Sequence, residues 1–301
     1  MRSNVRFRFA LLAPLVGALL ALVAVSAPAA QAASFGAETL VAGNCTEAFK
    51  TCGSDPLTGP YAFPKEPTVA EARTEGYNQA AGHPAWGITS FKVNTEGTLP
   101  NEVPAGLATT GPVKRVRTDV GPGVSTNPEA VPLCTMKEFD ASEKEEEAVP
   151  GSGFYPEPAC KSETEIGVNQ VTVYAGPKPF PEGGDLPIEG KAYNLVQPQG
   201  VASVFGVALK LPIPLTKGAL EKAFAEKGNP LGKPTEEFLE KQQYYAHTLI
   251  NGNVEWAGNY HDYYEINVST ALPLISSRLI LKGNIGSTGN GGYITLPSNC
   301  A

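Results

Sequence analysis

The sequence predicts an all-β fold, namely an immunoglobulin-like or related antiparallel β-sandwich with a short helical insert. Two observations predict it. Seven or more short segments alternate apolar and polar residues with the period of two that a half-buried strand requires, and turn residues separate them. In addition, 27 Pro and 32 Gly make up about a fifth of the 301 residues, which suits many short strands joined by turns better than helices.

Residues 1–32 have the features of a secretory signal peptide. Three arginines in the first eight positions precede an apolar stretch, and Ala30-Gln31-Ala32 is an A-x-A cleavage site. The alternative is that this segment is retained as an N-terminal membrane anchor. No later stretch approaches the about 20 apolar residues of a membrane span. We therefore expect cleavage after Ala32, a secreted or cell-surface location, and no transmembrane span in the mature chain.

The charge of the exported chain argues against some classes of partner. The leader carries three of the 23 basic residues and no acid, so its removal leaves 20 Lys and Arg against 30 Asp and Glu, a net charge near −10. An acidic surface repels phosphate groups. We therefore expect no nucleic acid and no anionic lipid as a partner, and the sequence points to no cofactor.

All five cysteines lie beyond the leader, and export would allow them to form disulfides. Cys45 and Cys52 are close enough in sequence to close a small loop. Cys134 and Cys160 bracket a hydrophilic loop, and a bridge between them would contribute on the order of 3 kcal/mol. Cys300 is left unpaired, which suggests an intermolecular bond, a free thiol or a shortened chain. No spacing matches a zinc site, so no metal is expected.

Three regions are expected along the chain: the leader 1–32, an N-terminal segment 33–80 and a sandwich domain 81–301. The segment 33–80 shows little periodicity and is rich in Gly, Pro, Thr and Ala. We therefore expect it to be extended or loop-rich and pinned by a Cys45–Cys52 bridge.

The first two strands of the domain are predicted by alternation. One spans residues 87–95 and the other residues 113–120, and in both every second residue is apolar or β-branched: Thr89, Phe91, Val93, Val116, Thr118 and Val120. A Gly-Pro-Gly turn at 121–123 ends the second strand, because proline has no N–H for a ladder and glycine tolerates turn angles. Cys134 is then expected to open a short helical turn.

The residue pattern in the middle of the chain predicts two strands and a helical insert. Residues 166–174 are rich in β-branched residues and are predicted to form a strand. Residues 177–191 are predicted to form a long turn region, because they are rich in Pro and Gly. The next strand places apolar residues on one face: Val201, Phe205, Val207, Leu209 and Leu211. Residues 216–245 then show helical spacing in two stretches, 216–227 and 234–245, so we expect a helical hairpin at one edge of the sheet.

The C-terminal part returns to strands. Residues 246–256 are predicted to turn at Asn251-Gly252, because this dipeptide is frequent in hairpins. A glycine-rich loop, 283–292, precedes a last strand at 293–296. Alternation marks two further strands between these segments, one with Tyr264, Ile266 and Val268 and one with Leu279 and Leu281.

Common local motifs of enzyme sites are absent from the sequence. It contains no G-x-S-x-G nucleophile elbow, no H-E-x-x-H metal site, no P-loop and no G-x-G-x-x-G strand–helix unit. An enzyme would therefore need an arrangement without a local signature. His83 precedes a proline and is expected to make a local hydrogen bond in a turn.

The richest group of aromatic and titratable residues spans residues 244–264. Its binding candidates are Tyr244, Tyr245, His247, Trp256, Tyr260, His261 and Tyr263. Flat aromatic rings offer apolar contact area at low entropy cost, so a platform for a glycan or a peptide is one interpretation. Acid–base or metal chemistry by the histidines with Glu255 and Asp262 is a second. In the third, the aromatic residues only fill the core or cover strand faces.

A series of short matches runs through most of residues 77–300: Tyr77, Gln79, Ala80, Gly82, His83 and Pro84, then Val113, Val116, Arg117 and Asp119, then Asn127, Pro128, Cys134, Thr135, Cys160, Glu165, Ile166, Gly167, Tyr193, Asn194 and Leu195, and finally Pro297, Ser298 and Cys300. Together they resemble a group of large secreted bacterial proteins built of β-sandwich domains. The resemblance implies a surface or secreted protein without a known activity, so no catalytic residue carries over. Relatives usually continue beyond the final cysteine, which would explain an unpaired Cys300, and the insert at 216–245 departs from the group.

The sequence therefore favours a secreted or cell-surface, non-catalytic β-sandwich protein that serves as a binding, adhesion-type or envelope structural module. Its partner would be a cell-wall or extracellular glycan, or a protein. The alternative is a secreted hydrolase acting on glycans, with acids such as Glu255 and Asp262 near aromatic rings.

Overall fold

The computed structural model describes residues 36–45, 76–77, 79–96, 108–109, 112–140, 155–175, 184–212, 243–268, 273–285 and 292–296. The chain divides into two compact units, Met1–Ser34 and Phe35–Ala301, and every described residue belongs to the second. The expected leader lies outside the described residues.

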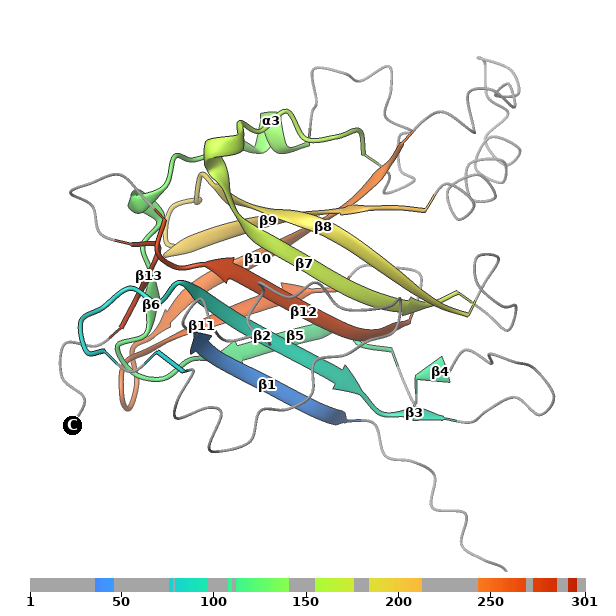
Figure 1. The fold of residues 1–301 in the computed structure, drawn as a ribbon, viewed down its shortest axis with the longest axis horizontal. Helices are drawn as coiled ribbons and strands as arrows, with labels where there is room; N and C mark the ends of the chain where they lie inside the picture. Colours follow the sequence, from blue (N-terminus) through green and yellow to red (C-terminus); the bar gives the residue numbers. More distant parts are fainter. Residues whose placement is uncertain are drawn as a thin grey trace, which may run out of the picture. The chain divides into compact units, whose positions relative to one another are not determined.

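The described part is almost entirely antiparallel β-structure, which confirms the predicted all-β class. Nine strands form one sheet in the order β1-β2-β12-β7-β8-β9-β10-β11-β5 (Figure 1). Their bounds are β1 Ala37–Cys45, β2 Trp86–Val93, β5 Arg115–Asp119, β7 Glu165–Tyr174, β8 Asp185–Leu195, β9 Ser203–Lys210, β10 Tyr245–Glu255, β11 His261–Asn267 and β12 Leu274–Lys282.

The remaining described elements are short. Two-residue strands form two further pairs, β3 Thr95–Glu96 with β4 Ala108–Thr109, and β6 Ser125–Thr126 with β13 Ile294–Thr295. The helical elements of the described residues are η2 Pro128–Ala130, α3 Met136–Phe139 and η4 Ser162–Thr164.

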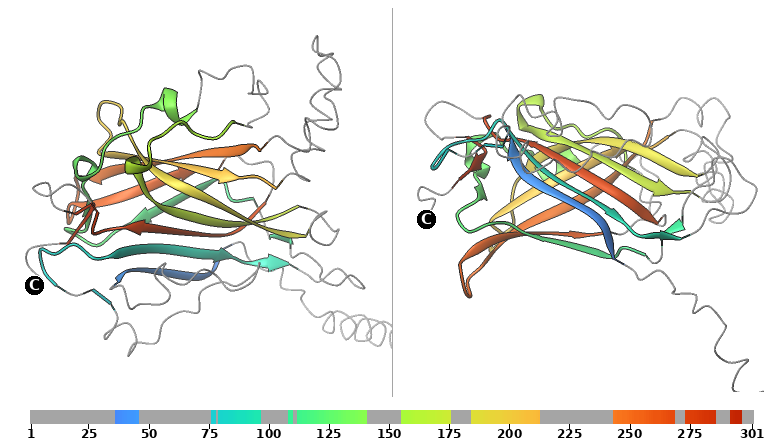
Figure 2. Two further views of the ribbon diagram at one scale, coloured as in Figure 1. Left: turned by 45° about the horizontal axis from the view of Figure 1, so that its top comes forward. Right: turned by 60° about the horizontal axis from the view of Figure 1, so that its bottom comes forward.

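The nine-stranded sheet curls into a half-barrel, so that the strands at its two ends face each other across a common interior (Figure 2). The side chains that fill this interior include Leu186, Ile188, Phe205, Val207, Leu209, Ile250 and Tyr293. A smaller cluster forms around the disulfide: Cys134, Phe139, Tyr193, Leu195, Val204 and Ala208. Because strand twist accumulates over nine strands, one continuous sheet supplies both layers that the sandwich pattern predicts.

Most of the predicted strands lie where the alternation of residues places them. β2, β7, β9, β11 and β12 cover the expected segments, and β5 exposes Arg115, Arg117 and Asp119 while it half-buries the residues between them. The short helical turn after Cys134 is also present as α3. Period-two alternation is therefore a good guide wherever one face of a strand is buried.

The N-terminal strand β1 was not predicted. It lies in the segment expected to be loop-rich, and it pairs with β2 from Ala37 opposite Val93 to Cys45 opposite Trp86. β1 is an edge strand, and Leu40 on it is exposed. A strand that buries little apolar surface needs no apolar alternation, which explains why its sequence carries no strand signal.

The predicted turn region 177–191 is wrong over its second half, because β8 already begins at Asp185. Pro187 of β8 pairs with Thr172 of β7. The pairing of β8 with β9 begins only at Gly190, so the missing N–H of Pro187 interrupts no hydrogen bond between β8 and β9. At Gly190, a Cβ atom would lie 2.1 Å from the Ala208 carbonyl oxygen, so close packing of neighbouring strands explains this glycine. Pro and Gly here serve strand packing and do not mark a turn.

The turn expected at Asn251-Gly252 is also wrong. β10 runs through both residues, and its chain reverses over residues 256–260, where Gly258 and Tyr260 have φ of 73° and 50°. At Gly252, a Cβ atom would meet the Ser203 Oγ at 2.1 Å and the Tyr264 ring at 2.9 Å. This glycine makes room for a tyrosine ring on the sheet.

Several predictions fall outside the described residues. These are the greater part of the helical insert 216–245, of which only the last three residues are described, and the cysteines Cys52 and Cys300. Cys45 is disulfide-bonded, but the predicted partner Cys52 is not described. His83 does form a hydrogen bond, yet its Nδ1 lies 3.0 Å from the carbonyl oxygen of Ile294, which is distant in sequence and not in the local turn.

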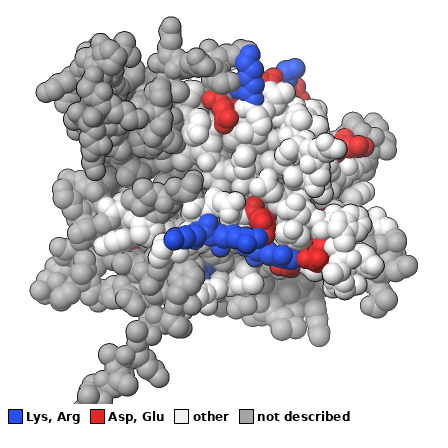
Figure 3. All heavy atoms as spheres, turned by 180° about the vertical axis from the view of Figure 1, so that it is seen from behind, with Lys and Arg blue, Asp and Glu red and all other residues white. Residues whose placement is uncertain are grey.

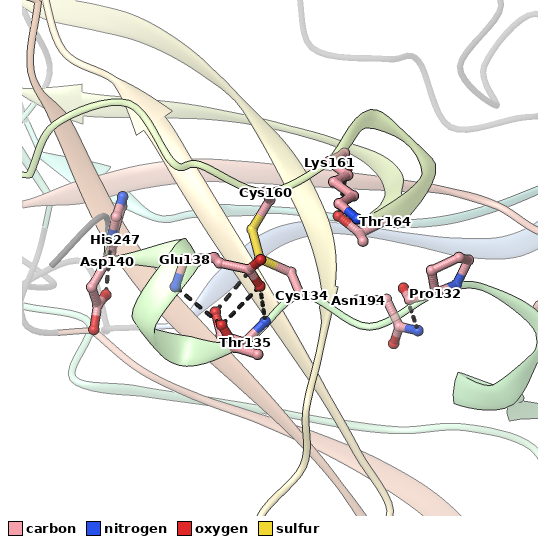
Figure 4. Close-up of a disulfide and its surroundings, with 10 residues drawn as sticks. All are labelled: Pro132, Cys134, Thr135, Glu138, Asp140, Cys160, Lys161, Thr164, Asn194 and His247. Atoms are coloured by element: carbon pink, nitrogen blue, oxygen red, sulfur yellow. Dashed lines mark hydrogen bonds and ion pairs between the residues drawn. A yellow bond between two sulfur atoms is a disulfide. The ribbon is translucent and has the colours of Figure 1, made fainter. Parts of the chain in front are cut away.

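The Cys134–Cys160 disulfide is present, with a Cα–Cα distance of 5.5 Å (Figure 4). Thr135 caps α3 in a capping box, because its Oγ1 accepts from the Glu138 N–H and the Glu138 carboxylate accepts from the Thr135 N–H. The segment before the disulfide is held by Asn194, whose Nδ2 donates to the carbonyls of Pro128 and Val131. The segment that leads into the disulfide is thus anchored on the end of β8, and we call the described residues between the two cysteines, 134–140 and 155–160, the disulfide loop.

Candidate functional site

The structure does not gather the seven aromatic and histidine candidates into one surface. Tyr244 is fully buried in the interior, and Tyr245 packs beside the disulfide cluster. His247 is covered by the disulfide loop. The other four candidates lie on or next to the hairpin that joins β10 and β11: Trp256, Tyr260, His261 and Tyr263.

His247 has a structural setting. Its ring is stacked on Tyr155 at a centroid distance of 4.3 Å and lies against Phe139 at the same distance, while its Nδ1 is 3.2 Å from an oxygen of Asp140. Burial lowers the pKa of His247, and the Asp140 carboxylate opposes this shift. Because the ring is enclosed between two aromatic side chains, it attaches the disulfide loop to β10 and presents no face to a ligand.

The tip of the β10–β11 hairpin presents two large aromatic side chains. Trp256 is 74 % exposed and Tyr260 is 65 % exposed. The positive φ of Gly258 and Tyr260 turns the chain tightly between them. Large aromatic groups at this exposure have little role in the core, so the hairpin tip is a candidate contact surface.

A network of charged side chains lies beside the hairpin on the outer face of β5 and β11. The Arg117 guanidinium donates to both oxygens of Asp119, lies 3.9 Å from the centroid of the Tyr263 ring and is 3.6 Å from a Glu255 oxygen. Figure 3 shows basic and acidic side chains side by side on a face of the described part. We call Arg117, Asp119, Glu255, Trp256, Asn259, Tyr260, His261 and Tyr263 the hairpin surface.

His261 is held in this network through both ring nitrogens. Nδ1 lies 2.6 Å from the side-chain oxygen of Asn259, and Nε2 lies 2.9 Å from an oxygen of Asp119. The hydrogen bonds from Arg117 and His261 lower the pKa of Asp119 to about 2. With both nitrogens occupied, His261 has no free site for proton transfer to a substrate, and the network favours binding over acid–base catalysis.

The acids Glu255 and Asp262 do not form a catalytic pair. Glu255 is opposite His261 in the β10–β11 register, whereas Asp262 is opposite Val254, so the two carboxylates leave opposite faces of the sheet. Glu255 contacts Arg117 outside, and Asp262 accepts from Ser125 toward the interior. Among the described residues, no group of three or more His, Cys, Asp or Glu is placed to hold a metal ion.

A second candidate site, not anticipated from the sequence, is a cleft of about 300 Å³ inside the half-barrel. It opens between the two ends of the sheet, with β1, β2 and β12 on one side and β5, β9, β10 and β11 on the other. Its apolar lining includes Phe91, Val116, Phe205, Ile250, Ile266, Leu279, Leu281 and Ile294. Only the curl of the sheet brings these residues together, so no local sequence signal could have revealed the cleft.

One part of the cleft wall carries hydroxyl groups, which we call the hydroxyl rim: Ser125, Thr126 and Tyr264. The Thr126 Oγ1 donates to the Ser203 Oγ at 3.3 Å and lies 3.1 Å from the Tyr264 hydroxyl. The Tyr264 ring stacks on Phe205 at 5.5 Å and lies against Gly252, which has no side chain to displace it. Burial raises the pKa of Tyr264 to about 12, so this phenol is neutral at physiological pH.

In the described residues, no helix is long and apolar enough to cross a membrane. Comparison with known proteins finds no matching family model, no similar curated protein and no similar solved structure. The resemblance to secreted β-sandwich proteins therefore stays a prediction.

Proposed function

We propose that this chain is a secreted or cell-surface, non-catalytic binding protein that holds an extracellular or cell-wall glycan at the hairpin surface. The observation that carries the proposal is the exposure of Trp256 and Tyr260 next to a polar network on the same hairpin. Sugar rings have apolar faces that stack on aromatic rings and hydroxyl groups that require hydrogen bonds, and the hairpin surface offers both.

The network next to the aromatic residues supports binding because it is ordered before any ligand arrives. Arg117, Asp119 and His261 are fixed by mutual hydrogen bonds, so few rotamers remain to be frozen when a glycan docks. Arg117 and Asp119 keep further capacity for hydrogen bonds, since a guanidinium has five donors and a carboxylate has about four acceptor positions.

Export is supported by two independent features. The leader-like sequence 1–32 predicts it, and the Cys134–Cys160 disulfide is of a kind that persists outside the reducing cytosol. A secreted module that presents aromatic side chains on a rigid sheet is in keeping with the adhesion-type role.

Binding of the purified protein to a glycan array and to isolated cell-wall polysaccharide tests the proposal. We expect specific binding by the wild type and a loss of at least about tenfold in affinity in the Trp256→Ala and Tyr260→Ala variants, because each removes a stacking ring. Leu133→Ala, which also truncates an exposed apolar side chain but lies before the disulfide, should bind like the wild type. The proposal fails if no glycan binds, or if the two hairpin variants bind as well as the wild type.

A further inference from the structure

The cleft lies on the other side of the sheet from the hairpin surface. Along β11, Tyr263 faces outward beneath Arg117, whereas Tyr264 faces the interior and lines the cleft. Adjacent residues of a strand point to opposite faces, so a ligand in the cleft and a glycan on the hairpin surface would contact different side chains, and Asp119 alone borders both sites. The cleft is therefore a separate candidate site.

The walls of the cleft suit an apolar small molecule. Aromatic and aliphatic side chains from both ends of the sheet line it, and its volume of about 300 Å³ is at the lower end of the range for small-molecule sites. The edge strands β1 and β5 do not pair with each other, which leaves the interior accessible between them. A molecule that entered here would remove apolar surface of both walls from water.

The hydroxyl rim determines which polar group fits. Because the Thr126 hydroxyl donates to Ser203, the hydrogen bond between Thr126 and Tyr264 must be donated by Tyr264. The Tyr264 oxygen also accepts a backbone hydrogen bond from Thr126, so it keeps one acceptor position, and it has no second proton to offer. A ligand that places a hydrogen-bond donor beside this oxygen satisfies it, whereas an ether or ester oxygen does not.

The charges around the cleft argue against an ionised ligand. Among the described residues that line it, none is Lys or Arg, and Asp119 is the sole ionisable acid. The Asp119 carboxylate is already paired with Arg117 and His261 on the outer face. An ionised carboxylate in the cleft would have no cationic partner among these described lining residues and would lose its hydration, which is strongly unfavourable.

We propose that the cleft binds a neutral, largely apolar small molecule whose hydroxyl group donates a hydrogen bond to Tyr264. The tail of the molecule packs between Phe91, Leu279 and Leu281 on one wall and Val116 and Ile266 on the other. Recognition of the tail is by shape and apolar contact, and recognition of the head is by a single directional hydrogen bond.

Fluorescence of Nile red, a neutral apolar dye, tests the site in the wild-type protein. We expect saturable binding with one dye per chain and displacement by 1-decanol at about tenfold lower concentration than by decanoate at pH 8, because the carboxylate loses hydration without a partner. The ether 1-methoxynonane, which has the same number of heavy atoms as 1-decanol, should compete less well than the alcohol. Absence of saturable dye binding, or equal competition by alcohol and carboxylate, overturns the proposal without any variant.

Two pairs of matched variants locate the ligand. Tyr264→Phe should weaken 1-decanol about fivefold and leave 1-methoxynonane unchanged, because it removes one hydrogen bond and keeps the ring. Tyr263→Phe makes the same chemical change on the outer face and should alter neither. Ala42→Trp projects a ring into the cleft from β1 and should abolish dye binding, whereas Gly43→Trp points to the opposite face, where a Cβ atom meets no atom within 4 Å, and should preserve it.

The result separates the two proposals. Trp256→Ala should bind Nile red like the wild type even if it has lost glycan binding, since the hairpin tip does not line the cleft. Loss of dye binding in Trp256→Ala but not in Ala42→Trp would place the dye on the hairpin surface and refute the cleft as its site.

Discussion

Single side chains in this protein often do something different from what their chemistry first suggests. His247 has the chemistry of a catalytic base, yet stacking between Tyr155 and Phe139 makes it the attachment point of the disulfide loop. Gly252 has the features of a turn residue, yet it provides space for the Tyr264 ring. In both cases the neighbours decide the role, and those neighbours are distant in the sequence.

The free energy of unfolding should fall as the pH drops below about 6.5, the ordinary pKa of histidine. Burial lowers the pKa of His247 in the folded state, so between that lowered pKa and 6.5 the unfolded chain binds a proton that the folded chain does not. Stability is therefore fully present above pH 6.5 and is lost as the pH falls, by at most about 1.4 kcal/mol per pH unit. Urea unfolding at pH 5 and at pH 8 measures it.

His247→Phe is the control for this prediction. It keeps an aromatic ring between Tyr155 and Phe139 but cannot be protonated, so the difference in stability between pH 8 and pH 5 should shrink. The carboxylates with lowered pKa, such as Asp119 and Glu165, titrate at lower pH and do not contribute in this window. An unchanged pH dependence in His247→Phe would contradict this role of the histidine.

Gly252→Ala should destabilise the fold by about 1–3 kcal/mol, because the added methyl group overlaps the Ser203 hydroxyl and the Tyr264 ring and forces both to move. Gly43→Ala is the matched control in another strand of the same sheet, where a Cβ atom meets nothing within 4 Å, and it should be neutral or slightly stabilising. Urea denaturation of the two variants measures the difference. Equal stabilities would mean that Gly252 is not needed for close packing.

At the scale of elements, the two edges of the sheet are protected in different ways. β5 turns Arg115, Arg117 and Asp119 outward, and charged residues on an edge strand oppose pairing with another chain. β1 is held in place at its C-terminal end by Cys45, which is buried and disulfide-bonded. The disulfide loop is an element of its own, held to β10 by the backbone pairing of Tyr155 with Tyr245.

Removal of the Cys134–Cys160 bridge in a Cys134→Ser/Cys160→Ser variant should lower the free energy of unfolding by about 3.5 kcal/mol, because the 26-residue separation sets the entropy that the unfolded chain regains. The loop should also detach from β10 more readily. Hydrogen exchange of the Tyr155 N–H, which donates to the Tyr245 carbonyl, reports this local opening. A variant with unchanged stability and exchange would show that packing alone holds the loop.

At the scale of the whole molecule, the predictions from the sequence succeed where burial is one-sided and fail where it is not. β5, β7 and β11 are found where period-two alternation places them. β1 is mostly exposed, and the first half of β8 contains Pro187 and Gly190, so neither carried the expected signal. The Cys134–Cys160 pair follows from spacing, whereas the aromatic group at residues 244–264 divides between the core, the disulfide loop and the hairpin tip.

The sequence by itself determined the all-β class, most of the strands and the disulfide at Cys134, because these depend on local alternation, turn chemistry and short loop closure. The curl of the sheet, the cleft and the separation of Glu255 from Asp262 were decided only by the tertiary structure. They depend on the pairing register and on the twist that accumulates across nine strands, and these join residues that lie far apart in the chain.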